Sequence, residues 1–192
     1  MRLILASTSS YRRALLSRLG LAFECVAPEV DETASEGETP ALQCARLSAA
    51  KAQAVAIRYP QALVIGADQV AELDGTAIGK PGSRERSSQQ LLAASNHSVR
   101  FHTGISVQHT ATGRSVLHID LTEVHFRALS EAMIEHYLDR ESALDCAGGF
   151  KCEGLGISLF NAIHTNDPTA LIGLPLIALS RILAEFGIDP LG

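Results

Sequence analysis

The chain has 192 residues, of which 46% are hydrophobic, and a mean hydropathy of +0.14. This composition suits one sizeable α/β core and is short for two full domains, so we expect residues 1–192 to form a single domain. The formal charge of -5 and the isoelectric point near 5.8 argue against a general surface for nucleic-acid polymers.

The cysteines and the apolar runs bear on the cell compartment. Cys25, Cys44, Cys146 and Cys152 form no C-x-x-C pair and no zinc spacing, which is typical of reduced thiols. The first residues do not resemble a signal peptide, and no apolar run approaches the ~20 residues of a membrane span. We therefore expect a cytoplasmic protein without a membrane partner.

The start of the chain changes character twice. Residues 3–6 are apolar and predict a buried strand, residues 7–10 are a hydroxyl cluster, and a helical pattern follows. A helix N-terminus offers free backbone N–H groups and a positive dipole end, so with Arg12 beside it this turn suits a phosphate. In the alternative, Ser9 or Ser10 only caps the helix and Arg12 is solvated.

The next segments supply carboxylates and a lysine. Residues 23–27 predict a second strand, and Asp31 and Glu32 follow it directly, where ligand sites of α/β proteins usually form. A helix is expected from Pro40 to about residue 58. It contains Lys51, and most helical lysines lie on the surface.

Residues 62–70 predict a central strand that is apolar enough to be covered on both faces. Asp68 stands at the far end of this run. A buried carboxylate is costly unless it is hydrogen-bonded, paired or bound to a metal, so its burial would imply a task. The alternative is a cap of the following turn. The Asp74-Gly75 pair then predicts a tight hairpin that returns to Lys80 near the strand ends.

The second half of the chain predicts further elements. A polar helix is expected at residues 83–95, and antiparallel strands at 99–107 and 115–126. A helix opens at Ser130, and a last amphipathic helix begins after residues 173–175. The histidines follow no metal-ligand spacing. The glycine-rich segment 147–156 predicts close backbone approach to a ligand, with Lys151 and Glu153 projecting from it.

Together these residue types suit a phosphoryl site with a divalent metal. Mg²⁺ takes hard oxygen ligands from one or two carboxylates and from substrate phosphates, and lysine and arginine neutralise the phosphoryl charge. The chain contains no Walker A, kinase or Rossmann fingerprint.

A resemblance sharpens this hypothesis. Seven segments resemble, in order, those of the Maf family of nucleoside triphosphate pyrophosphatases: residues 5–12 (LASTSSYR), 30–32 (VDE), 66–70 (GADQV), 79–81 (GKP), 103–104 (TG), 147–150 (AGGF) and 173–175 (GLP). The resemblance implies an α/β fold with a mixed β-sheet, flanking helices and two lobes around a central cleft, related to the inosine triphosphatase type. It also implies a homodimer and hydrolysis of nucleoside triphosphates to monophosphate and pyrophosphate with a divalent metal cation, Mg²⁺ or Mn²⁺.

The resemblance also assigns roles to residues. Asp68 takes the position of the proton acceptor and is expected to orient or deprotonate the attacking water, and it also bonds to the metal. These two roles compete, because a metal-bound carboxylate is a weaker base. Glu32 matches a carboxylate expected on the metal. Positions that would hold the phosphates are matched by Ser7, Arg12, Lys51 and Lys80. Ser10 departs from the commoner proline, which implies a slightly less rigid loop.

Three positions concern the base. Where pyrimidine-preferring members usually show arginine, threonine and glutamine, this chain has Tyr11, Gln69 and Glu153. This set resembles the YceF-like branch, which acts on 7-methyl-GTP, although tryptophan is commoner there at the first position. Stacking of the cationic 7-methylguanine on Tyr11 would gain roughly 0.5–2 kcal/mol. Glu153 can accept from the N1–H and the exocyclic amine of guanine.

Alternatives remain for these positions and for the function. Tyr11 could instead pack on its lobe while Glu153 pairs with Lys151. The sequence predicts a pyrophosphatase that removes 7-methyl-GTP or a related modified nucleotide from the pool. One alternative is a family member that prefers dTTP, UTP or a canonical purine triphosphate. Another is a nucleotide-binding regulator of septum formation without turnover.

Overall fold

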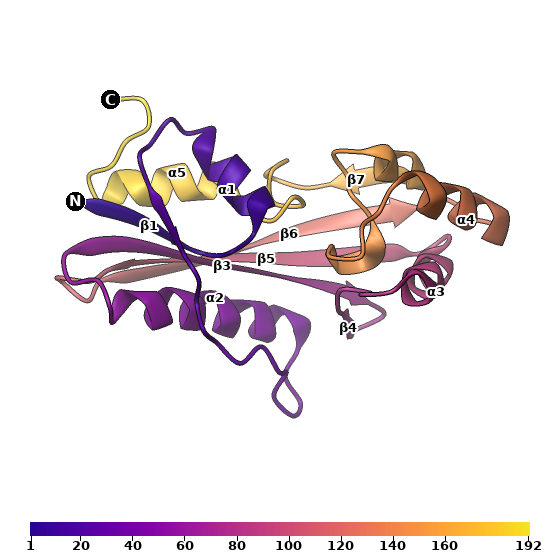
Figure 1. Ribbon diagram of the computed structural model, residues 1–192, viewed down its shortest axis with the longest axis horizontal. Helices are drawn as coiled ribbons and strands as arrows, with labels where there is room; N and C mark the ends of the chain where they lie inside the picture. The colour runs from indigo at the N-terminus through magenta and orange to yellow at the C-terminus, as the bar shows by residue number, and fades with distance from the viewer.

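The computed structural model describes residues 1–192 and shows a mixed sheet flanked by helices, which confirms the expected α/β class (Figure 1). The strands are β1 (Arg2–Ala6), β2 (Glu24–Val26), β3 (Ala62–Leu73), β4 (Thr76–Ile78), β5 (Ser98–His109), β6 (Ser115–Phe126) and β7 (Phe160–His164). The helices are α1 (Ser10–Ser17), α2 (Pro40–Ala56), α3 (Arg84–Ala94), α4 (Glu131–Arg140) and α5 (Leu176–Glu185), with short 3-10 helices η1 (Ala147–Gly149) and η2 (Leu155–Leu159).

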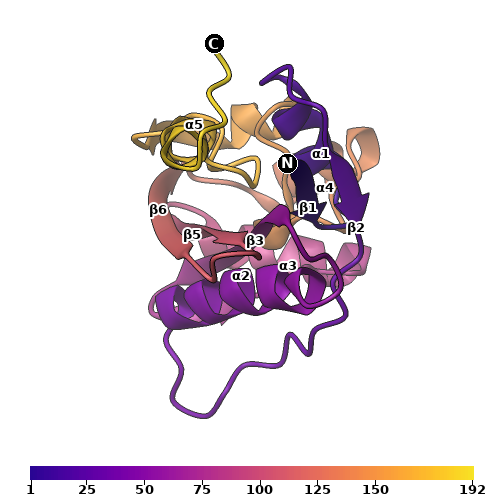
Figure 2. The ribbon, with the colours of Figure 1, turned by 90° about the vertical axis from the view of Figure 1, so that its left-hand side faces the viewer.

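The sheet has the order β2-β1-β3-β5-β6-β7, and β4 pairs with β3 outside this path. β1 runs parallel to β2 and β3, whereas all other pairs are antiparallel. Figure 2 shows α2 on one side of the sheet and α1 and α5 on the other. The alternation of β1 explains this, since Leu3 and Leu5 pack in the core with α1 and α5, while Ile4 and Ala6 pack with α2.

A separate core fills the other end of the molecule. It joins α3, α4 and the far ends of β5 and β6 around three aromatic rings, Phe101, Phe126 and Phe150. Phe150 meets the other two edge-on, with ring centroids 5.5 and 5.6 Å away. Two cores that share the long strands β3, β5 and β6 give the two lobes expected from the resemblance (Figure 1).

The central strand is longer than the sequence predicts. β3 does not end near Asp68 but continues to Leu73, because β5 pairs with it along this whole length. On its other edge, β3 pairs with β1 only as far as Gly66, and its pairing with β4 begins at Ala71. Residues 67–70 therefore have no strand partner on that edge, and Asp68 lies inside the strand beside a break in the sheet.

Most turn and cap signals are confirmed. Asp74 and Gly75 form the β3–β4 turn with positive φ angles of 50° and 80°, and Ser83 and Ser130 cap α3 and α4. No sequence pattern predicted β7, a short edge strand that pairs irregularly with the end of β6. No helix reaches the combination of length and apolar character that a bilayer crossing requires.

One glycine sets how closely α2 approaches the sheet. A Cβ on Gly66 would stand 2.3 Å from the Ser48 carbonyl oxygen and 2.4 Å from the Ala52 nitrogen. We expect Gly66→Ala to push α2 outward and to lower the free energy of unfolding by about 1–3 kcal/mol or more.

Urea unfolding monitored by circular dichroism measures this change. Gly79→Ala is the matched control, because a Cβ there meets nothing within 4 Å. It should change the free energy of unfolding by less than about 0.5 kcal/mol. Equal losses in both variants would contradict the packing argument.

Candidate active site

A cleft of about 560 Å³ opens at the break in the sheet between the two lobes. A smaller cavity of about 110 Å³ adjoins it and shares several lining residues, including Tyr11, Arg12, Gln69 and Lys80. The larger cleft is lined by eight of the residues selected from the sequence: Ser7, Tyr11, Arg12, Glu32, Lys51, Asp68, Gln69 and Lys80. Glu153 lines the smaller cavity. The fold thus gathers all nine selected residues at one site.

The serine-rich turn is ordered by its own hydroxyl groups. The buried Ser7 accepts a hydrogen bond from the Ser9 N–H at 3.1 Å, and the Ser9 hydroxyl accepts from the Arg12 N–H at 3.4 Å. Ser9 is therefore the N-cap of α1. Capping and facing the cleft are compatible, because the same turn also lines the cavity.

Arg12 is held against the C-terminal part of the chain. Its Nε donates to the Gly173 carbonyl oxygen at 3.0 Å, whereas its Nη atoms form no hydrogen bond within the chain. Burial lowers the pKa of the Arg12 guanidinium, and the charge of Asp68 acts in the opposite direction. Arginine stays protonated under such conditions. The two Nη groups are available to an anion in the cleft.

Lys51 binds two carboxylates at once. Its Nζ lies 2.6 Å from Asp68 Oδ1 and 2.6 Å from Glu32 Oε1. The side chains of Lys51 and Asp68 are only 7% and 8% exposed, so this lysine is not the surface group that its helical setting suggests. The close approach of α2 to Gly66 brings Lys51 within reach of β3. The compensated charge explains why Asp68 is tolerated inside the sheet.

Glu32 and Asp31 have different surroundings despite being neighbours. Although burial acts to raise the pKa of Glu32, the hydrogen bond and charge of Lys51, with the charges of Lys80 and Arg12, hold it below its ordinary value. Asp31 instead accepts from the Thr33 N–H at 2.9 Å and does not line the cleft. Only one member of the acidic pair faces the site.

Cys44 lies directly behind Asp68. Its thiol contacts the carbonyl oxygens of His102 at 3.1 Å and Asp68 at 3.5 Å. Burial, together with the charge of Asp68, raises the pKa of Cys44 to about 12. The thiol therefore stays protonated near neutral pH and serves as packing and as a weak donor, not as a nucleophile.

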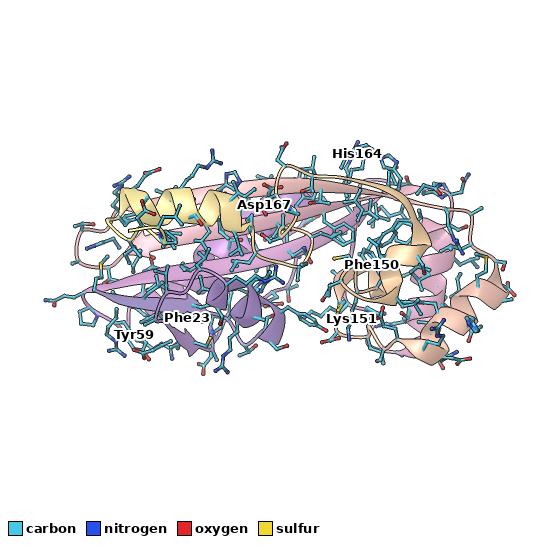
Figure 3. All side chains as sticks on the ribbon, turned by 90° about the horizontal axis from the view of Figure 1, so that it is seen from above. Phe23, Tyr59, Phe150, Lys151, His164 and Asp167 are labelled. Atoms are coloured by element: carbon cyan, nitrogen blue, oxygen red, sulfur yellow. The ribbon has the colours of Figure 1, made fainter.

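Tyr11 marks the smaller cavity, where two lobes meet. Lys151 Nζ lies 5.9 Å from the centroid of its ring, and the Cys146 thiol lies 3.8 Å from its hydroxyl group. Burial raises the pKa of Tyr11, whereas the neighbouring Lys151 ammonium acts to lower it. Figure 3 shows Lys151 at the inner edge of its lobe, next to Phe150.

Glu153 is not paired with Lys151. No ion pair joins these two side chains, and Glu153 Oε2 instead accepts from the Cys152 thiol at 3.4 Å. The alternative in which Lys151 neutralises Glu153 is therefore not observed. Glu153 is exposed at the wall of the smaller cavity.

Gln69 is fixed by a loop that the sequence analysis did not connect with the site. Its Nε2 lies 3.0 Å from each of three acceptors: Thr103 Oγ1, the Ala170 carbonyl and the Leu171 carbonyl. These contacts direct the amide nitrogen to the loop and leave Oε1 as the group without an internal partner. The same loop presents Gly173 to Arg12, so it anchors two site residues.

This loop is built around Asp167, which is 1% exposed. Its carboxylate accepts from the Thr169 hydroxyl at 2.6 Å and from the Ile177 N–H at 2.6 Å. The second contact caps α5, whose own N-cap is Pro175 and has no side chain acceptor. The sequence shows a turn at residues 166–169, but the long contact to residue 177 was not foreseen.

The acidic groups limit what metal the site could hold. The chain contains no group of three or more His, Cys, Asp or Glu side chains arranged to bind a metal. The two carboxylates of Glu32 and Asp68 converge on one cation, the Lys51 ammonium. Two hard oxygen donors suit Mg²⁺ or Mn²⁺ when substrate phosphates complete the ligand set, and do not suit a structural zinc site.

Solved structures establish the class of fold. A HAM1 protein from Coxiella burnetii aligns with a TM-score of 0.56 at 18% identity, over 96% of this chain and 99% of that one. The Ham1 protein of Staphylococcus aureus aligns with a TM-score of 0.54 at 14% identity, over 98% and 100%. This chain thus has the Ham1-like α/β fold, which agrees with the expected fold type.

Sequence comparison gives the family. A family model described as Maf-like protein matches residues 2–186, so the chain belongs to the Maf family. A relative from Xanthomonas oryzae pv. oryzae (strain MAFF 311018), named 7-methyl-GTP pyrophosphatase, is 61% identical over 97% of each chain. A protein of the same name from Albidiferax ferrireducens is 50% identical over 100% of this chain and 96% of that one.

The contact between Glu32 and Lys51 can be tested by titration. We expect Lys51→Met to raise the pKa of Glu32 toward its ordinary value of 4.5, because Lys51 is the main group that lowers it. Lys80→Met should raise it less, since Lys80 acts only through its charge. Carboxyl carbon chemical shifts followed by NMR against pH measure both.

The sign of the accompanying stability change follows from linkage. The pKa of Glu32 is lower in the folded chain than in the unfolded chain, so its contribution is present above its unfolded pKa and is lost as pH falls through its folded pKa. In the Lys51→Met variant, the protonation of Glu32 in acid should therefore lower the free energy of unfolding by less than it does in the wild type. Equal pKa changes in the two lysine variants would count against the contact.

Proposed function

We propose that this protein is a hydrolase of phosphoric anhydrides that converts 7-methyl-GTP to 7-methyl-GMP and pyrophosphate, and so removes a modified nucleotide from the pool. The observation that carries the chemistry is the buried contact of Asp68 with Lys51, in a cleft that Arg12 and Lys80 also line. The substrate is inferred from relatives at 50–61% identity that are named 7-methyl-GTP pyrophosphatase.

The triphosphate would be bound by the cationic wall of the cleft. Arg12 offers its two Nη groups, and Lys80 is exposed and forms no ion pair within the chain. Ser7 and the N-terminal turn of α1 add hydroxyl and backbone donors. These groups gather positive charge locally in a chain whose net charge is negative, which an anionic substrate requires.

Glu32 and Asp68 are the residues that would hold a divalent cation. Their two carboxylates already share one cation, and the phosphates of the substrate would supply further oxygen ligands. When bound, Mg²⁺ or Mn²⁺ supplies charge neutralisation on the phosphoryl group that is attacked. Lys51 would then exchange its contact with Glu32 or Asp68 for one with a phosphate oxygen.

Asp68 would direct the water that attacks the phosphoric anhydride. Its carboxylate faces the cleft from within a long strand, so its position is set by the sheet and not by a mobile loop. A carboxylate oxygen of Asp68 would accept a proton from the water while the water oxygen bonds to the α-phosphorus. The bond between the α-phosphorus and the bridging oxygen would break, and pyrophosphate would leave. Lys51 and Arg12 would offset the charge that develops on the phosphoryl oxygens.

Base recognition would fall to Tyr11, Glu153 and Gln69 around the smaller cavity. Stacking on Tyr11 favours a cationic ring, and the Glu153 carboxylate both accepts from guanine and attracts the positive charge. Gln69 Oε1 adds a further acceptor. Lys151 already lies over the Tyr11 ring, so a cationic base would use the free side of the ring or displace this lysine toward the phosphates.

We further propose that residues 1–192 act as one domain, that the protein works as a homodimer, and that it is located in the cytoplasm. The single family match across both lobes, and the strands that the lobes share, support the first point. The dimer and the location are inferred from the family resemblance and from the unpaired cysteines.

The role of Asp68 has a direct test. We expect Asp68→Asn to lower turnover by about 10²–10⁴-fold, because the amide cannot accept the proton of the attacking water. Release of pyrophosphate measures turnover, and thermal unfolding checks the fold. Asp31→Asn is the matched control, since that carboxylate does not line the cleft. Turnover near the wild-type rate in Asp68→Asn would remove this mechanism.

A substrate panel tests the base preference. Pyrophosphate release is compared for 7-methyl-GTP, GTP, UTP and dTTP with Mg²⁺, with Mn²⁺ and with a chelator. We expect the highest kcat/KM for 7-methyl-GTP and no turnover with the chelator. A preference for UTP or dTTP would favour the pyrimidine-type alternative, and nucleotide binding without turnover under either metal would favour a regulator.

A further inference from the structure

One carboxylate, that of Glu141, holds the loop which brings Lys151 and Glu153 to the smaller cavity. Glu141 Oε1 accepts from the Leu155 N–H at 3.1 Å, and Oε2 accepts from the Gly156 N–H at 3.0 Å. Two successive backbone donors thus converge on one carboxylate. Such charge-assisted contacts are stronger than ordinary hydrogen bonds.

Tyr137 connects the same carboxylate to the start of the loop. Its hydroxyl donates to Glu141 Oε2 at 3.0 Å and accepts from the Lys151 N–H at 3.4 Å. Burial, with the nearby charge of Glu141, raises the pKa of Tyr137, so the hydroxyl remains a donor at neutral pH. Residues 151 to 156 are therefore bound at both ends by two side chains from the end of α4.

The position of Glu141 is unfavourable for the helix that carries it. Glu141 is the C-cap residue of α4, where the negative end of the helix dipole repels a carboxylate. It forms no ion pair with any cationic side chain of the chain. The charge of Glu141 does not stabilise α4, so the hydrogen bonds to the loop explain why a carboxylate is present at this position.

Gly154 leaves room for this arrangement. A Cβ at Gly154 would stand 2.0 Å from Glu141 Oε1, which no side chain could tolerate without displacing the carboxylate. The contact therefore depends both on the Glu141 carboxylate and on the absence of a side chain at Gly154, and each can be changed by mutation.

We propose that Glu141 is a positioning residue for base selectivity: it fixes the loop 151–156 so that Glu153 and Lys151 face the base. The inference rests on the proposed function, because it concerns the same cleft. Glu141 lies outside the lining of both cavities and acts only through the loop. Loosening the loop should weaken recognition of 7-methylguanine while leaving the chemistry at Asp68 unaffected.

The experiment compares Glu141→Gln, Gly154→Ala and the double variant with the wild type. The amide of Glu141→Gln turns an N–H against one of the two backbone donors, and the methyl of Gly154→Ala pushes the carboxylate away. Glu131→Gln is the control, because it removes a carboxylate from the exposed first turn of the same helix. Kinetics use 7-methyl-GTP and UTP, whose pyrimidine lacks the guanine amine.

We expect the ratio of kcat/KM for 7-methyl-GTP over UTP to fall about 10-fold or more in each single variant, through KM, because a small misplacement of binding groups is costly. The kcat for UTP should stay within about twofold of the wild type. The double variant should lose no more than the worse single variant, since both changes break one contact. The Kd of 7-methyl-GMP, measured by calorimetry, should rise in parallel with KM.

Two results would overturn the inference. An unchanged substrate ratio in Glu141→Gln would do so, and this variant decides alone if Gly154→Ala does not fold. Equal losses of kcat for both nucleotides, with a lower Tm, would show a structural role only. A wild-type chain that does not prefer 7-methyl-GTP over UTP would instead remove the proposed substrate, and this inference with it.

Discussion

The contact of Lys51 with Asp68 and Glu32 is the interaction on which the site depends. A carboxylate inside a sheet is costly, and removing one partner of a buried ion pair typically costs about 3–5 kcal/mol because the other charge is left uncompensated. The contact needs α2 close to β3, which Gly66 permits. It also needs an open strand edge, which exists because β1 ends at Ala6. The charge balance of the site thus depends on how closely α2 packs on β3 and on where β1 ends.

The same break in the sheet explains why the site lies between two lobes. The long strands β3, β5 and β6 carry both cores, while β1 serves only one of them (Figure 1). Arg12 and Lys51 come from one lobe, whereas Lys80, after β4, and the loop with Lys151 and Glu153 come from the other. A nucleotide in this cleft would therefore touch both lobes. The loop around Asp167 accepts hydrogen bonds from both Gln69 and Arg12, so it fixes the positions of both residues in the cleft.

The Ham1 proteins are only 14–18% identical to this chain, so the similarity concerns the fold alone. A fold of this kind can carry different chemistries, so function has to be argued from the site. The proposed function rests on the contact of Asp68 with Lys51, on the cations that line the cleft and on the cavity at Tyr11. It rests also on relatives at 50–61% identity that are named 7-methyl-GTP pyrophosphatase. The chain belongs to the Maf family, and its cleft gathers the charged groups that the proposed reaction requires.

Local patterns in the sequence determined much of this protein. Apolar runs indicated β1 and the core of β3, and hydroxyl and glycine signals indicated the caps of α1 and α4 and the β3–β4 turn. Short motifs indicated the residues that meet in the cleft. Those features depend on neighbours within a few residues, which a sequence displays directly. Tertiary structure alone decided the length of β3, the pairing of β7, the burial of Lys51 and the anchoring of Gln69 and Arg12 by the loop around Asp167. Each of these results from contacts between segments far apart in the chain, and such contacts follow from packing that no local pattern encodes.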